Sequence, residues 1–394
     1  ILILSLSVLS TLLFSACTDQ ANQPESQAET IIGKHTIRFT EPPKRIPAPH
    51  SVDAPLLGNG FTGVALSGTP ESQAFYVARN DFWRLKSALD ESFPLVLAKI
   101  ELDIPQLKDA SYLVEQQLYD AVSTARFTKG DISVSYKAFV PATEDMLIVD
   151  LNMEGNGAVE GSAGIFFLGK EEQINKPPLE RIFPDVREHE TKPNGVEYLS
   201  RAFVDSVDIP TKGAMALRVS GSTDGKFTLE PGKTVRLVCA FSSNFKSDDC
   251  VATVIKKVED FPPARQAEIE KSHKEWWRNY WEKSYVSIPD SVIEKQYYLS
   301  LYGMGSCSRD IDFPPSIFGT WITKERPYWN GDYHLNYNHM APYYALYSAN
   351  RIEQADPYIS SMLAQIERGN YYSEKVTGIP GGILLPVGAG PLGV

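Results

Sequence analysis

Short alternations of apolar and polar residues dominate residues 35–261. The clearest alternations are at residues 132–139, 146–151, 164–168, 214–219 and 234–241, and clusters of Gly, Asn, Asp and Pro separate them. Alternation is typical of half-buried strands, because successive side chains of a strand point to opposite faces. We expect no long helix in this part. The pattern predicts a large antiparallel β-sandwich over residues 35–261.

The periodicity changes after a pair of prolines at positions 262 and 263. Residues 265–283 carry a wide aromatic stripe at helical spacing, which predicts an amphipathic helix inside a linker over residues 262–288. The stripe consists of Ile269, Trp276, Trp277, Tyr280 and Trp281. Such a stripe is typical of core packing, so we expect it to fasten the β-domain to the next part of the chain.

Residues 289–394 read as helices joined by long loops. Asp290 is a good N-cap for a helix that continues to about Tyr302. A second helix is expected from about Pro342, which suits a first turn, and a third over residues 356–368. This part is too short for a closed ring of helix pairs.

The loop before Pro342 carries the most specific polar pattern. His334, Asn336 and Asn338 follow one another at a spacing of two, and an extended backbone would place them on one face. Asp332 continues the same alternation. Three neutral polar groups on one face predict a surface for an uncharged, ring-shaped ligand such as a sugar.

Two tryptophans upstream, Trp321 and Trp329, strengthen the sugar interpretation. The alternative is structural, since Asn and His before a helix often act as caps and turn formers. Asp332 could orient His334 or contact a sugar hydroxyl, or it could be a solvated turn residue. Glu325 is the other nearby carboxylate.

Composition narrows the class of partner. The net charge of -11 argues against nucleic acid or an anionic membrane surface as the main partner. The chain has no Gly-rich phosphate loop, Cys-x-x-Cys pair or His-Glu-x-x-His helix. We therefore expect no nucleotide cofactor and no metal.

The N-terminus predicts export. Residues 1–14 are an apolar run that is too short to span a membrane, and Ser15-Ala16-Cys17 follows, which resembles a bacterial lipobox. We expect residues 1–16 to be a lipoprotein signal peptide, Cys17 to be lipidated, and residues 17–34 to be a flexible tether. The protein would then be a secreted lipoprotein, periplasmic or anchored at the outer membrane or cell surface, with the lipid as its only membrane contact. The alternative is an ordinary secretory signal with an incidental cysteine.

Three further cysteines are Cys239, Cys250 and Cys307. The odd number leaves at least one of them free, and a Cys239–Cys250 disulfide stays open.

Two blocks of sequence resemble glycoside hydrolase family 95, the α-L-fucosidase and α-L-galactosidase family. The first joins Gly58-Asn59-Gly60 to Asn80-Asp81-Phe82-Trp83, and the second runs from Phe318-Gly319-Thr320-Trp321 to the His-x-Asn-x-Asn-x-x-Met stretch that ends at Met340. The chain departs from the family after Met340. We expect Gly58-Asn59-Gly60 to form a tight turn with positive φ, and Asn80, Asp81 and Trp83 to be buried and hydrogen-bonded or to reach the helical domain.

The resemblance implies both a fold and an activity. The fold is a β-supersandwich, a helical linker and, over residues 289–394, the first part of an (α/α)6 barrel of the six-hairpin glycosidase type. The activity is exo-acting, inverting release of terminal α-L-fucosyl or α-L-galactosyl residues from complex glycans. Asn336 and Asn338 match the asparagines that position the attacking water, and His334 matches a histidine that contacts the sugar.

The same resemblance places the general acid and the carboxylate that activates the water beyond Val394, so we expect these 394 residues alone to be inactive. Other carboxylates in the chain, in the loop over residues 170–196, either form a surface cluster or overhang the barrel mouth. They are Glu180, Asp185, Glu188 and Glu190. Two other functions remain open: another (α/α)6 barrel glycosidase or phosphorylase, and a non-catalytic glycan-binding lipoprotein.

Overall fold

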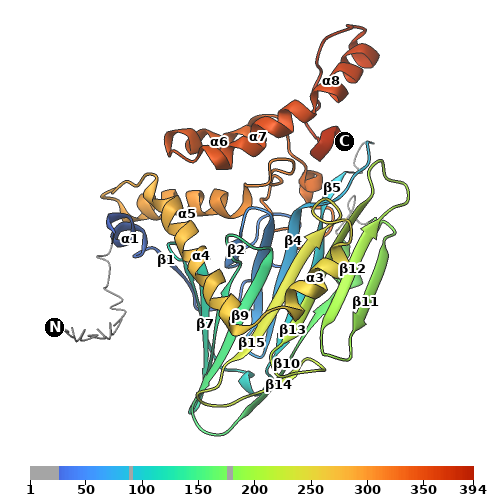
Figure 1. The fold of residues 1–394 in the computed structure, drawn as a ribbon. Helices are drawn as coiled ribbons and strands as arrows, with labels where there is room; N and C mark the ends of the chain where they lie inside the picture. The colour runs from blue at the N-terminus through green and yellow to red at the C-terminus, as the bar shows by residue number, and fades with distance from the viewer. Residues whose placement is uncertain (1–25, 88–91, 175–180) are drawn as a thin grey trace, which may run out of the picture.

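The computed structural model describes residues 26–87, 92–174 and 181–394. Two large antiparallel sheets form the N-terminal part, and helices lie across one end of them (Figure 1). The larger sheet has the strand order β1 (Thr36–Phe39), β6 (Ser111–Gln117), β7 (Val122–Lys129), β8 (Ile132–Phe139), β9 (Met146–Glu154), β15 (Val235–Ser243), β13 (Thr211–Val219), β12 (Glu197–Phe203) and β11 (Val186–Thr191). The smaller sheet has the order β14 (Lys226–Leu229), β10 (Val159–Phe166), β5 (Phe93–Asp103), β4 (Ser72–Arg84), β3 (Thr62–Thr69) and β2 (Leu56–Gly58). The short turns η1 (Pro105–Leu107) and α2 (Lys170–Gln173) lie in connections.

The main core lies between the two sheets. Phe75, Ile100, Leu147 and Met215 belong to it, and each is almost fully buried. These residues come from β4, β5, β9 and β13, so both sheets contribute to one apolar interior. The expected β-sandwich is confirmed, because alternating side chains on each strand are buried between two layers.

One helix of more than a single turn within residues 35–261 was not expected. Helix α3 (Cys250–Glu259) begins at Asp249, whose side chain accepts a hydrogen bond from the backbone N–H of Ala252. Val254 and Val258, four residues apart, pack against the outer face of the larger sheet. Ten residues with a single apolar stripe are easily overlooked between strands, although the cap and the spacing of four were both visible in the sequence.

The predicted tether over residues 17–34 is partly replaced by structure. Helix α1 (Gln27–Ile32) is capped by Ser26, and its Ala28 and Ile32 are fully buried against aromatic residues of the helical part. Burial of these apolar side chains explains why this segment is ordered rather than tethering. Residues 1–16, predicted to be a signal peptide, and residues 17–25 with Cys17 lie outside the described residues.

The linker helix joins the sandwich to the helices above it. Helix α4 (Pro263–Glu282) buries Trp277, Tyr280 and Trp281, and these rings pack with α5 (Ser291–Cys307) in one aromatic cluster. The stripe therefore lies in a core, as the sequence indicated. Asp290 caps α5 by accepting hydrogen bonds from two backbone N–H groups, at 2.9 and 3.1 Å.

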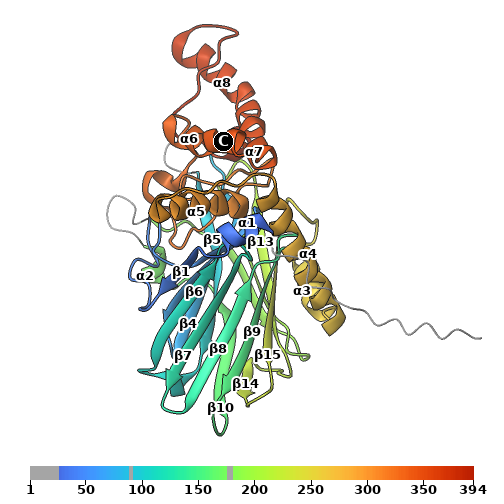
Figure 2. The same cartoon turned by 90° about the vertical axis from the view of Figure 1, so that its left-hand side faces the viewer.

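The later helices differ in their bounds from the expectation. Helix α6 (Tyr337–Ser348) begins five residues before Pro342, and the helix expected over residues 356–368 is two helices, α7 (Ile352–Ala364) and α8 (Ile366–Tyr372). Figures 1 and 2 show α6 to α8 stacked above α5, away from the sheets. Turns η3 (Ser373–Thr377) and η4 (Pro391–Gly393) complete the described chain.

The described residues contain neither a helix that could span a membrane nor a disulfide between the three cysteines. None of the helices there is long and apolar enough to cross a bilayer. Cys239, Cys250 and Cys307 are buried and free, so the disulfide left open between the first two is absent.

Candidate active site

The loop that leads into α6 has a strained backbone. Within η2 (Tyr328–Gly331), Trp329 and Asn330 have φ of 52° and 55°, and His334 has φ of 50°. Left-handed conformations cost non-glycine residues about 1 to 3 kcal/mol each, and they persist where surrounding contacts fix them. Such strain makes this loop a candidate for function.

Tyr333 anchors the strained loop to the sandwich. Its ring is fully buried, meets the edge of Trp83 on β4 at a centroid distance of 5.4 Å, and stacks on His339 of α6 at 4.8 Å. Burial lowers the pKa of His339 to about 4, so this imidazole is neutral at pH 7. The sandwich and the first turn of α6 thus hold the loop from two sides.

A hollow of about 620 Å³ lies beside the loop. Trp329, Asp332 and His334 line it together with Lys86 of the sandwich and Tyr372 at the end of α8. Three of the six predicted ligand-contacting residues are therefore brought together. A concave site with an aromatic wall and a few fixed polar groups is typical of a small-molecule site.

Asp332 orients His334. Oδ1 of Asp332 lies 2.7 Å from Nδ1 of His334 and also accepts a hydrogen bond from the backbone N–H of His334 at 3.0 Å. Because the carboxylate holds Nδ1–H, Nε2 is the ring nitrogen left to contact a ligand. Asp332 is only 7% exposed, which excludes the interpretation of a solvated turn residue.

Trp329 offers an exposed aromatic surface. Its side chain is 63% exposed, its ring stacks on Phe318 at a centroid distance of 6.4 Å, and it lies 6.0 Å from the ring of His334. Phe318 supports the indole from one side. The remaining surface suits the apolar face of a sugar ring, with His334 beside it to accept or donate a hydrogen bond.

Asn336 and Asn338 do not share an extended face with His334, which corrects the sequence prediction. Asn336 is the N-cap of α6, and its side chain accepts a hydrogen bond from the backbone N–H of Asn338 at 3.3 Å. Asn338 therefore lies in the first turn of a helix rather than in an alternating strand. Both asparagines are exposed, and neither lines the hollow. The capping bond and the left-handed φ of His334 end the alternation.

Trp321 is also placed away from the hollow. Its Nε1–H donates to the carbonyl of Leu57 at 2.8 Å, and its ring packs on the smaller sheet. A Cβ on Gly63 of β3 would lie 3.1 Å from this indole, so the glycine allows the close approach. Trp321 fixes the loop to the sandwich instead of facing a ligand.

The other candidate carboxylates lie on the sandwich or, in the case of Glu325, pair with it. Glu325 and Asp185 both pair with the buried Arg201, and Glu188 accepts a hydrogen bond from Ser200 on the neighbouring strand. Glu190 likewise lies on β11, where it accepts from Tyr198. None of these four lines the hollow, and Glu180 lies outside the described residues.

The two sandwich segments that resemble the family, Gly58-Asn59-Gly60 and Asn80-Asp81-Phe82-Trp83, lie where the sandwich meets the helical part. Gly60 has φ of 88°, as expected for the tight turn. Asn80 donates to the carbonyls of Gly60 and Cys307 and accepts from Thr320, while Asp81 pairs with Arg79. Both roles left open thus hold for Asn80, because its buried hydrogen bonds reach the helical part, whereas the partner of Asp81 lies within the sandwich.

Sequence reasoning missed the wall of the hollow that the sandwich provides. Lys86, Ser87 and Ser92 come from the connection between β4 and β5, more than two hundred residues before the motif. Lys86 pairs with Asp208 at 2.9 Å. No local pattern marks these residues, because only the packing of the sheets against the helices brings them near Trp329. Within the ranges that the structure describes, no three His, Cys, Asp or Glu side chains could hold a metal ion.

One family model matches part of the chain. Residues 263–386 match the glycosyl hydrolase family 95 catalytic domain, which confirms the resemblance seen in the sequence for this part of the chain. No curated protein matches the chain.

One solved structure shares the fold of this chain. A protein provisionally named kojibiose phosphorylase, from the human microbiome, superposes with a TM-score of 0.60 at 13% identity, over 89% of this chain and 53% of its own. A bacterial glucoamylase complexed with acarbose gives a TM-score of 0.42 at 10% identity, over 84% of this chain and 54% of its own. The chain therefore spans about half the length of these structures. The first of them supports the predicted order of β-sandwich, linker and barrel helices.

Proposed function

We propose that the full-length protein is an exo-acting, inverting glycoside hydrolase that releases terminal α-L-fucosyl or α-L-galactosyl residues from complex glycans. One observation carries the proposal: Trp329, Asp332 and His334, which line the hollow together, belong to the segment that matches the family 95 catalytic domain. The geometry supports the following residue roles. Trp329 supports the sugar ring, His334 contacts a hydroxyl through Nε2, and Asp332 holds the imidazole in place.

Asn336 and Asn338 keep the proposed role of positioning the attacking water. Both side chains are exposed next to the hollow's loop, and Asn338 makes no side-chain hydrogen bond within the described residues. An amide oxygen is a very weak base, so the water must also meet a carboxylate that polarises it.

The carboxylates for hydrolysis are proposed to come from outside these 394 residues. Inversion uses two carboxyl groups about 6.5 to 9.5 Å apart, one as acid and one as base. Among the described residues that line the hollow, Asp332 is the single carboxylate, and it is bound to His334. We therefore expect this part of the protein to be inactive alone.

The test uses the full-length protein with aryl α-L-fucosides and α-L-galactosides. We expect release of the sugar, with the β-anomer appearing first by proton NMR, and a rate that does not depend on inorganic phosphate. Release of the α-anomer first would overturn inversion. Saturable glycan binding without any turnover would replace the enzyme with a binding protein.

Phosphorolysis is the second candidate, and the shared fold with the protein named kojibiose phosphorylase favours it. At 13% identity that likeness concerns the fold alone. A strict requirement for phosphate, with formation of a sugar 1-phosphate, would decide for this reaction.

We also propose that the protein is a secreted lipoprotein attached through Cys17. Labelling cells with a fatty-acid analogue should mark the wild-type protein and leave Cys17→Ser unmarked. A wild-type protein that is exported without label would favour the ordinary secretory signal.

A further inference from the structure

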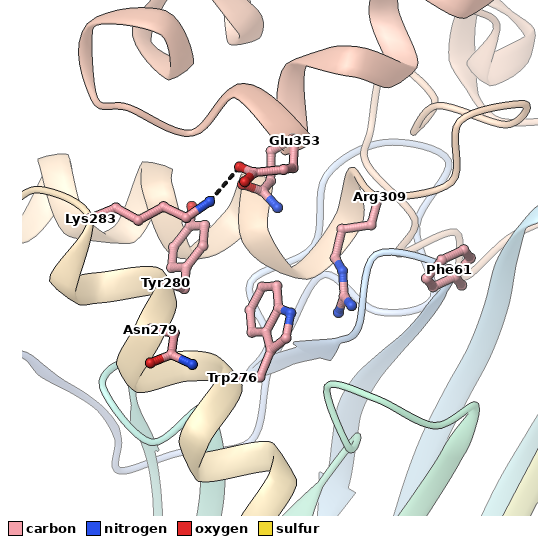
Figure 3. Close-up of a pocket in the computed structure, with 8 residues that line it drawn as sticks. Phe61, Trp276, Asn279, Tyr280, Lys283, Arg309 and Glu353 are labelled. Carbon is pink, nitrogen blue, oxygen red and sulfur yellow. Dashed lines mark hydrogen bonds and ion pairs between the residues drawn. The ribbon is translucent and has the colours of Figure 1, made fainter.

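A second hollow, of about 290 Å³, lies where the sandwich, α4 and α7 meet (Figure 3). It shares no lining residue with the hollow beside Trp329. Phe61 lies on its sandwich side, Trp276 on α4, Arg309 just after α5 and Gln354 near the start of α7. Figure 3 shows the guanidinium of Arg309 next to the indole of Trp276.

Two arginines and two aromatic rings form one layered stack, in which Trp276, Tyr280 and Arg309 line the hollow and Arg351 does not. The guanidinium of Arg351 lies 4.5 Å from the centroid of Tyr280, Tyr280 stacks on Trp276 at 5.4 Å and 12°, and the guanidinium of Arg309 lies 4.2 Å from the centroid of Trp276. Cation–π contacts hold both arginines in fixed orientations. The stack is therefore rigid, which lowers the entropic cost of binding a ligand against it.

Arg309 has an open hydrogen-bonding edge. Its Nη1 donates to the carbonyls of Asn59 and Ala142 at 2.7 and 2.6 Å, while Nε and Nη2 make no hydrogen bond within the described residues. No carboxylate there forms an ion pair with it, since the nearby Asp145 pairs with Arg79. Burial lowers the pKa of Arg309 to about 10, as expected for a cation that lacks a close counter-charge.

The Gly-Asn-Gly turn makes room for this arginine. A Cβ on Gly60 would lie 2.3 Å from Cβ of Arg309, and the φ of 88° also favours glycine. The signature thus serves the placement of Arg309 as well as the joint between domains. By contrast, the cation Lys283 at the rim is already neutralised by Glu353 (Figure 3).

Gln354 supplies an acceptor that lacks a donor. The residue is 3% exposed, lines the hollow, and its Oε1 has no hydrogen-bond partner. A buried acceptor without a donor costs about 1 to 3 kcal/mol. A hydroxyl group of a bound ligand would satisfy it.

We propose that this hollow binds a monosaccharide-sized hydroxy acid, namely a uronate unit of an acidic glycan. The carboxylate contacts the open edge of Arg309, a hydroxyl donates to Oε1 of Gln354, and the ring lies against the apolar edges of Phe61 and Trp276. Arginine presents paired N–H groups that match a carboxylate, which is why an acid is favoured over a neutral sugar. The site is independent of the proposed catalytic function.

The test measures binding of D-glucuronate to the full-length protein by calorimetry, with D-glucose and acetate as probes of the ring and the charge alone. We expect saturable binding of glucuronate, with glucose and acetate each at least tenfold weaker. Arg309→Gln should weaken glucuronate binding at least tenfold. The matched control is Arg278→Gln, which removes the same charge from an exposed position on α4 that does not line the hollow, and it should leave binding unchanged.

A second variant covers the case in which Arg309→Gln fails to fold. Asn279→Trp, at an exposed rim position, should fill the hollow and abolish binding with an unchanged Tm. His334→Ala should bind glucuronate as the wild type does, which separates this site from the catalytic one. The proposal fails if glucuronate does not saturate the protein, if glucose or acetate binds equally well, or if Asn279→Trp binds as tightly as the wild type.

Discussion

At the scale of single residues, Asn336 and Asn338 have the same proposed catalytic role and different structural ones. Asn336 caps α6, whereas the side chain of Asn338 contacts no described residue through a hydrogen bond. Loss of an N-cap typically costs about 1 kcal/mol. Substitution can therefore separate catalysis from stability at two neighbouring positions.

We predict that Asn338→Ala lowers kcat of the full-length enzyme by roughly 100-fold or more, as for loss of a group that activates the nucleophile, and leaves Tm unchanged. Asn336→Ala should lower kcat similarly and also lower Tm. Asn336→Asp is the matched control, because it keeps the cap and changes the amide. Steady-state kinetics and thermal melts check both variants, and a wild-type rate for Asn338→Ala would remove its role.

His339 gives the protein a pH-dependent stability. Its pKa is about 4 in the folded protein, against an ordinary value of 6.5, so the unfolded chain binds the proton more readily. The contribution of the neutral His339 to the free energy of unfolding is fully present above pH 6.5, and it is lost as the pH falls toward 4. One such histidine changes the free energy of unfolding by roughly 3 kcal/mol at most over this pH range.

We predict that His339→Phe makes Tm less dependent on pH between 6.5 and 4. Phenylalanine keeps an aromatic ring against Tyr333 and Tyr343, which lie 4.8 and 5.8 Å from the imidazole, and it cannot be protonated. Thermal melts at half-unit pH intervals measure the slope for both proteins. Parallel curves for the variant and the wild type would show that other groups set the acid sensitivity.

At the scale of elements, the joint between β4 and the start of the helical part depends on Asn80. Its side chain makes hydrogen bonds with Gly60, Cys307 and Thr320, all of them buried. We predict that Asn80→Ala destabilises the protein by about 2 to 3 kcal/mol, because partners are left unsatisfied. Hydrogen exchange should rise over residues 307–320.

The control for Asn80→Ala is Asn156→Ala, at an exposed turn where the side chain donates to Asp131 at 3.3 Å. Its effect should stay within about 0.5 kcal/mol. If both variants melt alike and exchange over residues 307–320 is unchanged, the joint does not depend on Asn80.

How far the sequence predicted these elements depends on the range of the interactions. Strands β8 and β15, helix α5 and its cap Asp290 follow from local alternation or local capping. The start of α6 could not be predicted from local alternation or local capping. His-x-Asn-x-Asn fits an extended segment by alternation and fits a cap followed by a helix equally well. The cap followed by a helix is favoured by the buried Tyr333, which packs on Trp83 from a distant strand.

The same argument holds for the candidate site. The pairing of Asp332 with His334 was visible because the two residues are two positions apart. Lys86 and Arg309 could not be recognised as site residues in the sequence. Lys86 reaches its hollow through the packing of the sheets, and Arg309 is placed in its hollow by a glycine turn some 250 residues earlier in the chain. Residues that depend on long-range packing leave no local pattern.

At the scale of the whole molecule, α6 and α7 expose apolar side chains on their outer faces. Tyr344 and Tyr347 on α6 are 56% and 48% exposed, and Ile359 and Leu363, four residues apart on α7, are 48% and 62% exposed. Side chains at this spacing share one face of a helix. Contiguous apolar surface of this kind promotes association in water.

We therefore predict that residues 18–394, expressed alone, associate or aggregate. Replacing Ile359 and Leu363 together by lysine should shift the protein toward monomer, as measured by size-exclusion chromatography with light scattering. The matched control replaces Val186 and Val204 by lysine, since these are 51% and 49% exposed on the sandwich and should not matter. Equal effects of the two pairs would mean that added charge alone controls solubility. A wild-type protein that is a monomer and melts in one cooperative transition would contradict the prediction. It would mean that the protein is stable with the outer faces of α6 and α7 exposed, so that these faces need no partner.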